Sequence, residues 1–252
     1  MRAIPIGQHD VEIKKNFEYW QKKPLLREIY LGFYKRILGY IRGDINGEIV
    51  ELGSGIGNFK MACPEAVATD LFPNPLIDRV ESVYHLTSND STASNFVLFD
   101  VFHHLKYPGF ALKELHRALA PHGRVIIFDP CISLLGFLVY GLFHHEPVAW
   151  RKKIEWLPVD LKENLNSEYY AAQGNATRIF KNNSEFMGDV EKDWKVVAIN
   201  KYADVAYVLS GGFSKPALIP KSFLPFFRLV EKFLGFFPII FATRILIVLE
   251  KK

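Results

Sequence analysis

The sequence feature that most constrains the fold is a glycine-rich loop directly after an apolar run. Residues 49–59 read IVELGSGIGNF and include Gly53, Gly55 and Gly57. The apolar run predicts a buried strand, and the residues after the last glycine predict the start of a short helix. Glycines admit positive φ and let a ligand touch the backbone, and a helix start offers N–H groups to an anionic or polar ligand. This order of elements predicts a binding site for a polar ligand.

Strands and helices are expected to alternate from residue 48 to residue 130, with an amphipathic helix at 108–119. The continuous apolar run NFVLFD at 95–100 is typical of a parallel strand that is covered on both faces. The alternation predicts a doubly wound, Rossmann-like α/β sheet of seven strands. These strands are expected near 48–52, 65–72, 79–84, 95–100, 120–130, 194–200 and 244–251.

Composition and charge narrow the classes of function. The net charge is +4 without any run of five basic residues, so nothing indicates a nucleic-acid partner. The two cysteines, Cys63 and Cys131, lack the spacing of a disulfide framework or zinc site, which favours a reducing compartment. The N-terminus has no apolar core typical of a signal peptide. We therefore expect a cytoplasmic protein.

The spacing of the glycines can be compared with the motifs of two alternative ligands, NAD and a nucleoside triphosphate. The nicotinamide dinucleotide fingerprint would place its third glycine at position 58, which is Asn58. The chain also lacks the motif of a nucleoside-triphosphate loop. Asp70, at the end of the second predicted strand, could accept hydrogen bonds from both hydroxyls of a ribose. A ribose-containing cofactor other than NAD fits this pattern best.

Residues 48–130 resemble the class I S-adenosylmethionine-dependent methyltransferases, in their small-molecule branch. Four blocks in order carry the resemblance: VELGSGIGNF, ATDLFPNP, NFVLFDVFHHL and ALKELHRALAPHGRVIIFDP. HHEP at 144–147, YVLSGGFS at 207–214 and the last strand are similar to bacterial methyltransferases associated with surface-polysaccharide synthesis. The resemblance implies S-adenosylmethionine as the cofactor.

The resemblance also implies how the cofactor is held. The glycines would lie against its methionine part, Glu51 would face its ammonium group, and Asp70 would hold the ribose with Leu71 against the adenine. The full set of expected cofactor-binding residues is Glu51, Gly53, Ser54, Gly55, Gly57, Asp70, Leu71, Ser82 and Asp100. The chain departs from the family's pattern at Ser82-Val83, where Asp-Ala is frequent beside the adenine.

The spacing of the predicted strands suggests an organisation within a single domain. We expect N-terminal helices over 1–46, a cofactor-binding α/β core over 47–130 and a helical cap insertion over 131–193. The segment 194–252 would add the last strands and a second apolar insertion. Long gaps between the last strands are typical of a cap over the mouth of the sheet.

Methyl transfer is an in-line displacement, which needs a base only if the acceptor must lose a proton. His104, just past the fourth strand, is the expected base; the alternative is a histidine that only shapes the pocket. His145 and Glu146 are expected to contact the substrate. Adjacent side chains point apart, so HHEP does not predict a metal site. The segment DVFHH lacks the motif of common N-methyltransferases, which favours an oxygen acceptor.

The apolar windows 132–143 and 219–242 admit two interpretations. They form the core of the cap, or they form an amphipathic surface that contacts a membrane or a lipid-linked acceptor. We therefore expect O-methylation of a small, sugar or lipid-linked glycan acceptor, with weak peripheral contact at the inner face of the membrane. Two alternatives stay open: an NAD-dependent sugar-nucleotide oxidoreductase or epimerase, and an inactive, cofactor-binding regulatory protein. The sequence leaves the oligomeric state open.

Overall fold

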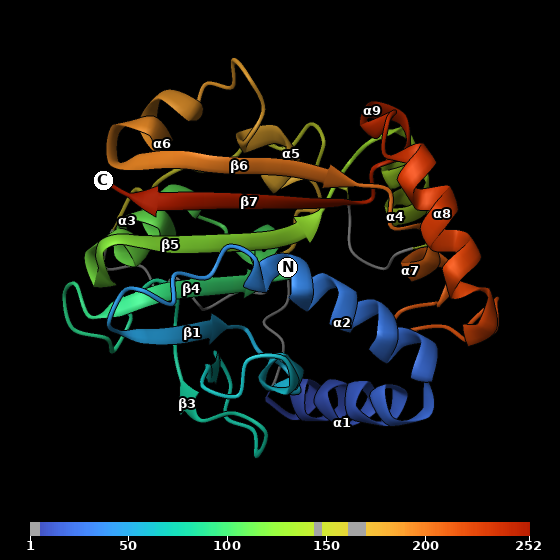
Figure 1. Cartoon of the computed structure of the whole chain (residues 1–252). Coiled ribbons are helices and arrows are strands. Elements are labelled where there is room, and N and C mark those ends of the chain that lie inside the picture. Colours follow the sequence, from blue (N-terminus) through green and yellow to red (C-terminus); the bar gives the residue numbers. More distant parts are fainter. Residues whose placement is uncertain (1–5, 144–147, 161–169) are drawn as a thin grey trace.

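The computed structural model describes residues 6–143, 148–160 and 170–252, which are built around one seven-stranded sheet (Figure 1). The strand order is β3-β2-β1-β4-β5-β7-β6. The expectation of a seven-stranded, Rossmann-like α/β fold is confirmed. The strands are β1 (Glu48–Leu52), β2 (Val67–Asp70), β3 (Arg79–Val80), β4 (Ala93–Phe99), β5 (Leu119–Pro130), β6 (Trp194–Tyr202) and β7 (Arg244–Lys251).

Most neighbouring strands pair in parallel, and β7 is the exception. It runs antiparallel to both β5 and β6, between which it is inserted. The carboxyl ends of β1, β4, β5 and β6 therefore share one edge of the sheet, at the right of Figure 1. We call this the carboxyl edge. Ligands of open α/β sheets bind at this edge, so it positions the candidate site.

Helices cover both faces of the sheet. They are α1 (Ile6–Lys22), α2 (Pro24–Leu38), α3 (Pro108–Ala118), α4 (Leu134–Phe143), α5 (Asn175–Ile179), α6 (Met187–Asp193), α7 (Val205–Leu209), α8 (Leu224–Leu234) and α9 (Pro238–Phe241), with the 3₁₀ turns η1 (Asn58–Met61), η2 (Phe102–His104) and η3 (Lys221–Phe223).

Alternation along the strands explains the two layers of helices. Phe96 and Leu98 of β4 belong to one buried cluster, which includes residues of α3 and α5. Val97, between them, belongs to a second cluster, which includes Phe33 of α2. Successive side chains of a strand point to opposite faces, so a run that is apolar throughout can form two cores at once.

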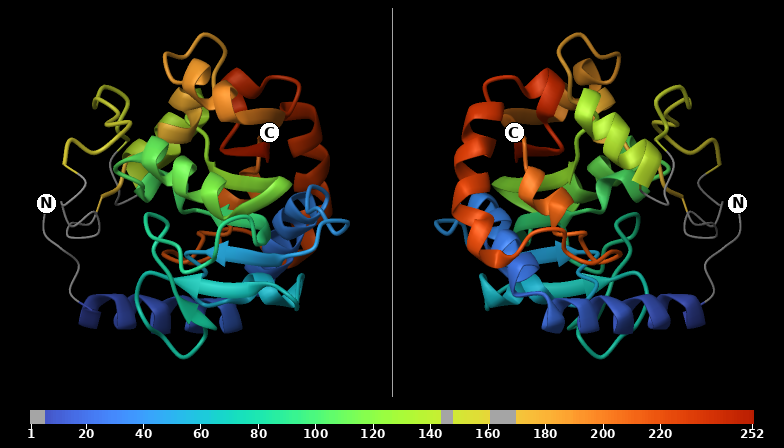
Figure 2. Two further views of the ribbon diagram at one scale, coloured as in Figure 1. Left: turned by 90° about the vertical axis from the view of Figure 1, so that its left-hand side faces the viewer. Right: turned by 90° about the vertical axis from the view of Figure 1, so that its right-hand side faces the viewer.

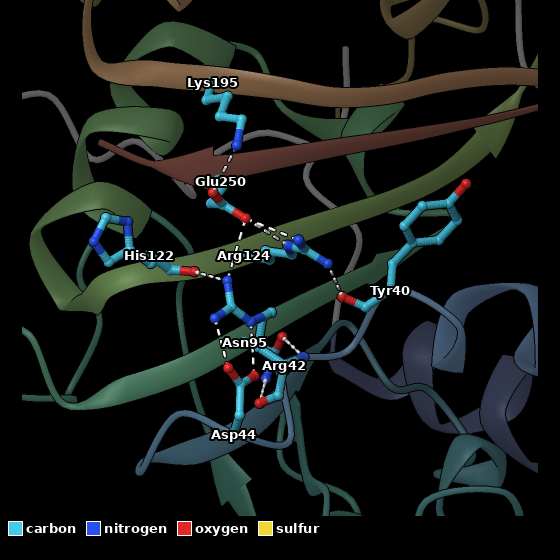
Figure 3. Close-up of polar contacts among 8 residues, drawn as sticks. All are labelled: Tyr40, Arg42, Asp44, Asn95, His122, Arg124, Lys195 and Glu250. Carbon is cyan, nitrogen blue, oxygen red and sulfur yellow. Dashed lines mark hydrogen bonds and ion pairs between the residues drawn. The ribbon is translucent and has the colours of Figure 1, made fainter.

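A polar network closes the edge of the sheet opposite the carboxyl edge (Figure 3). Glu250 of β7 accepts hydrogen bonds from Arg124 of β5 at 2.8 and 3.0 Å, from Arg42 at 3.3 Å and from Lys195 of β6 at 3.3 Å. Asn95 of β4 fixes the Arg42 backbone, since its side chain accepts from the Arg42 N–H and donates to the Arg42 carbonyl. Side chains from β4, β5, β6, β7 and the segment before β1 thus tie the starts of β4, β5 and β6 to the end of β7.

Three elements are shorter than the sequence predicts. The second strand, expected over 65–72, spans only Val67–Asp70. The helix expected after the glycine loop is only the 3₁₀ turn η1, because Pro64 disfavours helical geometry at the residue before it. The third strand, expected over 79–84, contains only Arg79 and Val80. It ends there because the Glu81 side chain turns back to accept from the Thr87 N–H at 2.6 Å.

The interpretation of the apolar windows as cap core is wrong for most of their large side chains. Most of the phenylalanines between residues 223 and 237 are exposed, and so are the outer residues of α4. Their burial could not be judged from the sequence, because a core helix and a surface-active helix can have the same composition.

Candidate functional site

The glycine loop links β1 to η1 at the carboxyl edge. Gly53, Gly55 and Gly57 all have positive φ, at 70°, 55° and 65°. A Cβ at Gly53 would lie 2.4 Å from the Val101 side chain, and one at Gly57 would lie 2.5 Å from the Leu76 carbonyl oxygen. A Cβ at Gly55 would meet nothing closer than 3.9 Å. The fold itself requires glycine at the outer two positions, whereas Gly55 borders open space.

Ser54 ties this loop to β2. Its N–H donates to the Thr69 carbonyl at 2.7 Å, and its hydroxyl accepts from the Thr69 N–H at 3.0 Å. The Ser54 and Thr69 hydroxyls both donate to the Glu51 carbonyl, at 3.2 and 2.8 Å. These bonds hold the loop rigidly, and in them the Ser54 hydroxyl bonds with backbone groups of Glu51 and Thr69.

Glu51 is the most unusual group at this edge. Its side chain is buried, and its Oε2 atom has no hydrogen-bond partner among the described residues. Burial raises the pKa of the Glu51 carboxyl to about 8, assisted by the nearby Asp70 and opposed by a hydrogen bond with Ser54. A buried carboxylate is costly unless a cation or a donor satisfies it. Glu51 thus fits a cationic group such as an ammonium.

Asp70 lies beside Glu51 at the end of β2. Its Oδ2 accepts from the Gly55 N–H at 2.8 Å, and its Oδ1 accepts weakly from the Phe72 N–H at 3.4 Å. Leu71, the next residue, is 37 % exposed although it is apolar. A carboxylate next to an exposed apolar side chain suits a ribose joined to an aromatic base.

Ser82 and Asp100 lie further from Gly55 in the chain. Ser82 forms a turn with His85, and its hydroxyl accepts from the Tyr84 N–H at 3.2 Å. Asp100 follows β4 with a positive φ of 56°, and its Oδ1 accepts from the guanidinium of Arg244. Arg244 is fully buried. The sequence analysis missed this ion pair, although a lone arginine at the start of the apolar run RILIVLE signals that a buried partner is needed.

Two histidines of η2 lie beside Asp100. The His103 Nδ1 and Asp129 Oδ1 atoms are 2.9 Å apart, and both side chains are buried. Burial raises the pKa of the Asp129 carboxyl, and His103 opposes this rise. Asp129 lies next to the last residue of β5, and Asp100 directly follows β4. The sequence analysis did not single out Asp129. Its position after the apolar run RVIIF could have signalled a polar group at the carboxyl edge.

His104 is half-buried, and its ring centroid lies 4.1 Å from that of His103. The His104 Nδ1 atom lies 3.0 Å from the carbonyl oxygen of Tyr170. A carbonyl can only accept, so Nδ1 carries the proton and Nε2 is the basic nitrogen of the neutral ring. This tautomer is the one that a general base at Nε2 requires.

The structure thus brings most of the predicted residues to one edge. Glu51, the glycines and Asp70 are contiguous through hydrogen bonds, and Gly53 abuts Val101, three residues before His104. The predicted substrate residues, His145 and Glu146, lie outside the described residues.

With this geometry in place, comparisons with known proteins identify the class. Residues 50–127 match a family model described as a methyltransferase domain. The match covers most of β1 and β5 and all of β2, β3 and β4, together with the glycine loop and η2. No curated protein sequence matches the chain.

Solved structures share the fold at low sequence identity. A SAM-dependent methyltransferase from Archaeoglobus fulgidus is 12% identical, with a TM-score of 0.53, over 90% of this chain and 94% of its own. Geranyl diphosphate C-methyltransferase from Streptomyces coelicolor A3(2), solved with Mg²⁺, geranyl diphosphate and S-adenosyl-L-homocysteine, is 11% identical, with a TM-score of 0.51, over 88% and 77%. At such low sequence identities, the similarity shows a shared fold only.

Residues 50–127 therefore form a methyltransferase domain within an α/β fold. The protein is a methyltransferase that uses S-adenosylmethionine as its cofactor. The match to a methyltransferase domain contradicts the alternative of an NAD-dependent oxidoreductase or epimerase.

Proposed function

We propose that the carboxyl edge holds S-adenosylmethionine through Glu51, the glycine loop and Asp70. The unpartnered Oε2 of Glu51 carries this proposal, because the cofactor's ammonium would satisfy it. The open space at Gly55 would receive the methionine chain, and Asp70 would accept from the ribose hydroxyls. Leu71 and Ser82 would flank the adenine, and Asp100 would close the site toward the acceptor.

We further propose that the enzyme methylates an oxygen of its acceptor, with His104 as general base. S-adenosylmethionine supplies a methyl group bound to a positively charged sulfur. His104 Nε2 would take the proton of the attacking hydroxyl, while the Tyr170 carbonyl keeps the proton on Nδ1. The buried His103–Asp129 pair would hold the His104 ring in position by packing against it.

The acceptor in this proposal is a small, sugar or lipid-linked glycan molecule. Exposed apolar side chains near the carboxyl edge favour an acceptor with an apolar tail, whose remote binding energy could position the reacting hydroxyl. Weak peripheral contact with the inner face of the cytoplasmic membrane would bring such an acceptor to the site. A cofactor-binding regulatory protein without catalysis is the competing proposal, and methyl-transfer assays distinguish the two.

Gly55→Val is expected to abolish binding of S-adenosylhomocysteine and leave the protein folded. Its side chain would fill the open space above the loop, and the left-handed backbone adds a cost of about 1–2 kcal/mol. Isothermal titration calorimetry measures the binding, and circular dichroism measures the folding. Gly57→Val is the matched control: its Cβ would collide with the Leu76 carbonyl, so this variant should lose stability itself. Full binding by Gly55→Val would contradict the site.

His104→Asn is expected to lower kcat for methyl transfer about 10²–10⁴-fold without changing the affinity for S-adenosylhomocysteine. The measurement is transfer of radiolabelled methyl to a polyprenyl-phosphate-linked hexose and to a free sugar nucleotide, as a function of pH. The acidic limb of the wild-type profile should disappear in the variant. His122→Asn, at an exposed position within β5, is the control and should keep the wild-type profile. An unchanged kcat would leave His104 only a pocket-shaping role, and no transfer by wild type would favour the regulatory protein.

A further inference from the structure

Helix α8 buries Leu224 in the core but turns much of its apolar surface outward. It directs Phe226, Leu229 and Phe233 outward, where these side chains are 59–69 % exposed, and it buries Glu231. The Glu231 carboxylate accepts from the Ala206 N–H of α7 at 2.7 Å, and burial raises its pKa to about 7. A helix of a soluble protein normally turns its apolar stripe inward. The orientation of α8 is nevertheless fixed, because Glu231 caps α7.

The neighbouring helices extend the same surface. In α4, Leu134, Phe137 and Leu142 are exposed at helical spacing, and residues 131–143 contain no charged residue. Helices α4 and α9 are in contact, and the Ser133 hydroxyl donates to the Ile240 carbonyl at 3.0 Å. The rings of Phe233 and Phe237 are 6.0 Å apart, which joins α8 to the start of α9. We call the exposed apolar side chains of residues 134–142 and 223–240 the apolar face.

Basic residues border the apolar face. Residues 221–243 contain Lys221, Arg228 and Lys232, and their one acidic residue is the buried Glu231. A groove of about 740 Å³ between α2 and α8 is lined by Lys35, Lys221 and Arg228, together with Glu28, which pairs with Lys221 at 2.8 Å. The rim therefore has a cationic excess beside a wide apolar surface.

The apolar face lies on the same side of the molecule as the carboxyl edge. In Figure 1, α4, α8 and α9 lie at the side toward which β1, β4 and β5 point. The right-hand view of Figure 2 looks onto this side. Whatever covers the apolar face therefore lies on the side of the molecule that carries the candidate site.

We propose that the apolar face binds the surface of a membrane that contains anionic lipid. Apolar side chains would enter the boundary between headgroups and acyl chains, while Lys221, Arg228 and Lys232 would meet anionic headgroups. No helix in the described residues is long and apolar enough to cross a bilayer, so the contact is interfacial. A second copy of the chain fits less well, because a two-fold contact would bring like-charged rims together. Only the link to a lipid-borne acceptor rests on the proposed function.

The test is co-sedimentation of the full chain with vesicles of phosphatidylcholine, with and without 30 % phosphatidylglycerol. Wild type is expected to bind the anionic vesicles and to dissociate as salt increases. Phe226→Asp/Phe233→Asp should weaken binding by at least about 10-fold, because two rings no longer enter the lipid. Lys221→Glu/Lys232→Glu should weaken binding to anionic vesicles alone, by at least about fivefold. Val80→Asp/Val159→Asp replaces exposed apolar residues outside the face and should bind as wild type does.

Three results would overturn the proposal. These are wild type remaining in the supernatant at low salt, equal binding to both vesicles, or a wild-type dimer that Phe226→Asp/Phe233→Asp converts to monomers. Binding of S-adenosylhomocysteine by each variant shows that it is folded. Wild type that binds vesicles without binding S-adenosylhomocysteine would contradict the proposed function and leave the membrane face intact.

Discussion

Asp100→Asn is expected to destabilise the protein by about 3–5 kcal/mol, because it leaves a buried charge unpaired. Its partner, Arg244, is only 1 % exposed and lies among aromatic rings, with its guanidinium 4.4 Å from the Tyr207 ring centroid. Burial acts to lower the pKa of Arg244, but Asp100, Tyr140 and Tyr207 together outweigh burial and keep the pKa above the ordinary value. Asp100 is partly exposed, so we expect a loss near the lower end of this range. Urea denaturation measures the change in the free energy of unfolding.

The matched control removes both charges. Asp100→Asn/Arg244→Met should recover most of the lost stability, since replacing both partners of a buried pair is often neutral. Arg244→Met alone should cost less than Asp100→Asn alone, because water can reach the remaining Asp100 carboxylate. A loss below about 0.5 kcal/mol for Asp100→Asn, which is typical of surface substitutions, would show that the pair is not needed.

Glu51→Gln is expected to weaken binding of S-adenosylhomocysteine by about 10- to 150-fold, the value of a hydrogen bond to a charged group. The amide retains the size of the side chain but cannot balance the charge of the ammonium. The matched ligand is 5′-methylthioadenosine, which lacks the amino-acid part and should bind wild type and variant equally. Calorimetry measures both affinities. An equal loss for both ligands would mean that the substitution distorts the loop.

The same substitution should change how stability depends on pH. The folded-state pKa of Glu51 is about 8, above its ordinary value of 4.5, so the folded protein binds the extra proton between these limits. The contribution of Glu51 to the free energy of unfolding is therefore fully present below pH 4.5 and is lost as the pH rises toward 8. Glu51→Gln removes the loss, so it should be more stable than wild type at pH 8.5 and similar at pH 4.5. Glu231 has the same sign and is present in both proteins, so the comparison cancels it.

The sheet and the glycine loop could be predicted from the sequence because both depend on local signals. Buried parallel strands are continuous apolar runs, and the spacing of Gly53, Gly55 and Gly57 is by itself enough to disfavour the nicotinamide fingerprint. The Asp70 carboxylate was also predictable, because the end of a parallel strand is fixed once the strand is found.

The remaining features depend on contacts that are distant in the sequence. The Arg244–Asp100 and His103–Asp129 pairs join different strands and loops, and no local pattern indicates which partner each charge has. The orientation of α8 was equally hidden, because it depends on Glu231 reaching the Ala206 N–H. Without that contact, the phenylalanines of α8 would be assigned to a core.

The apolar face and the carboxyl edge lie on the same side of the molecule, and this arrangement has a kinetic consequence. On the proposed docking, the enzyme meets a lipid-borne acceptor in two dimensions, so the relevant concentration is the acceptor's mole fraction in the bilayer. Adding acceptor-free lipid would then slow turnover although the amount of acceptor per volume stays the same. Vesicle composition, rather than bulk substrate, would set the rate of methylation.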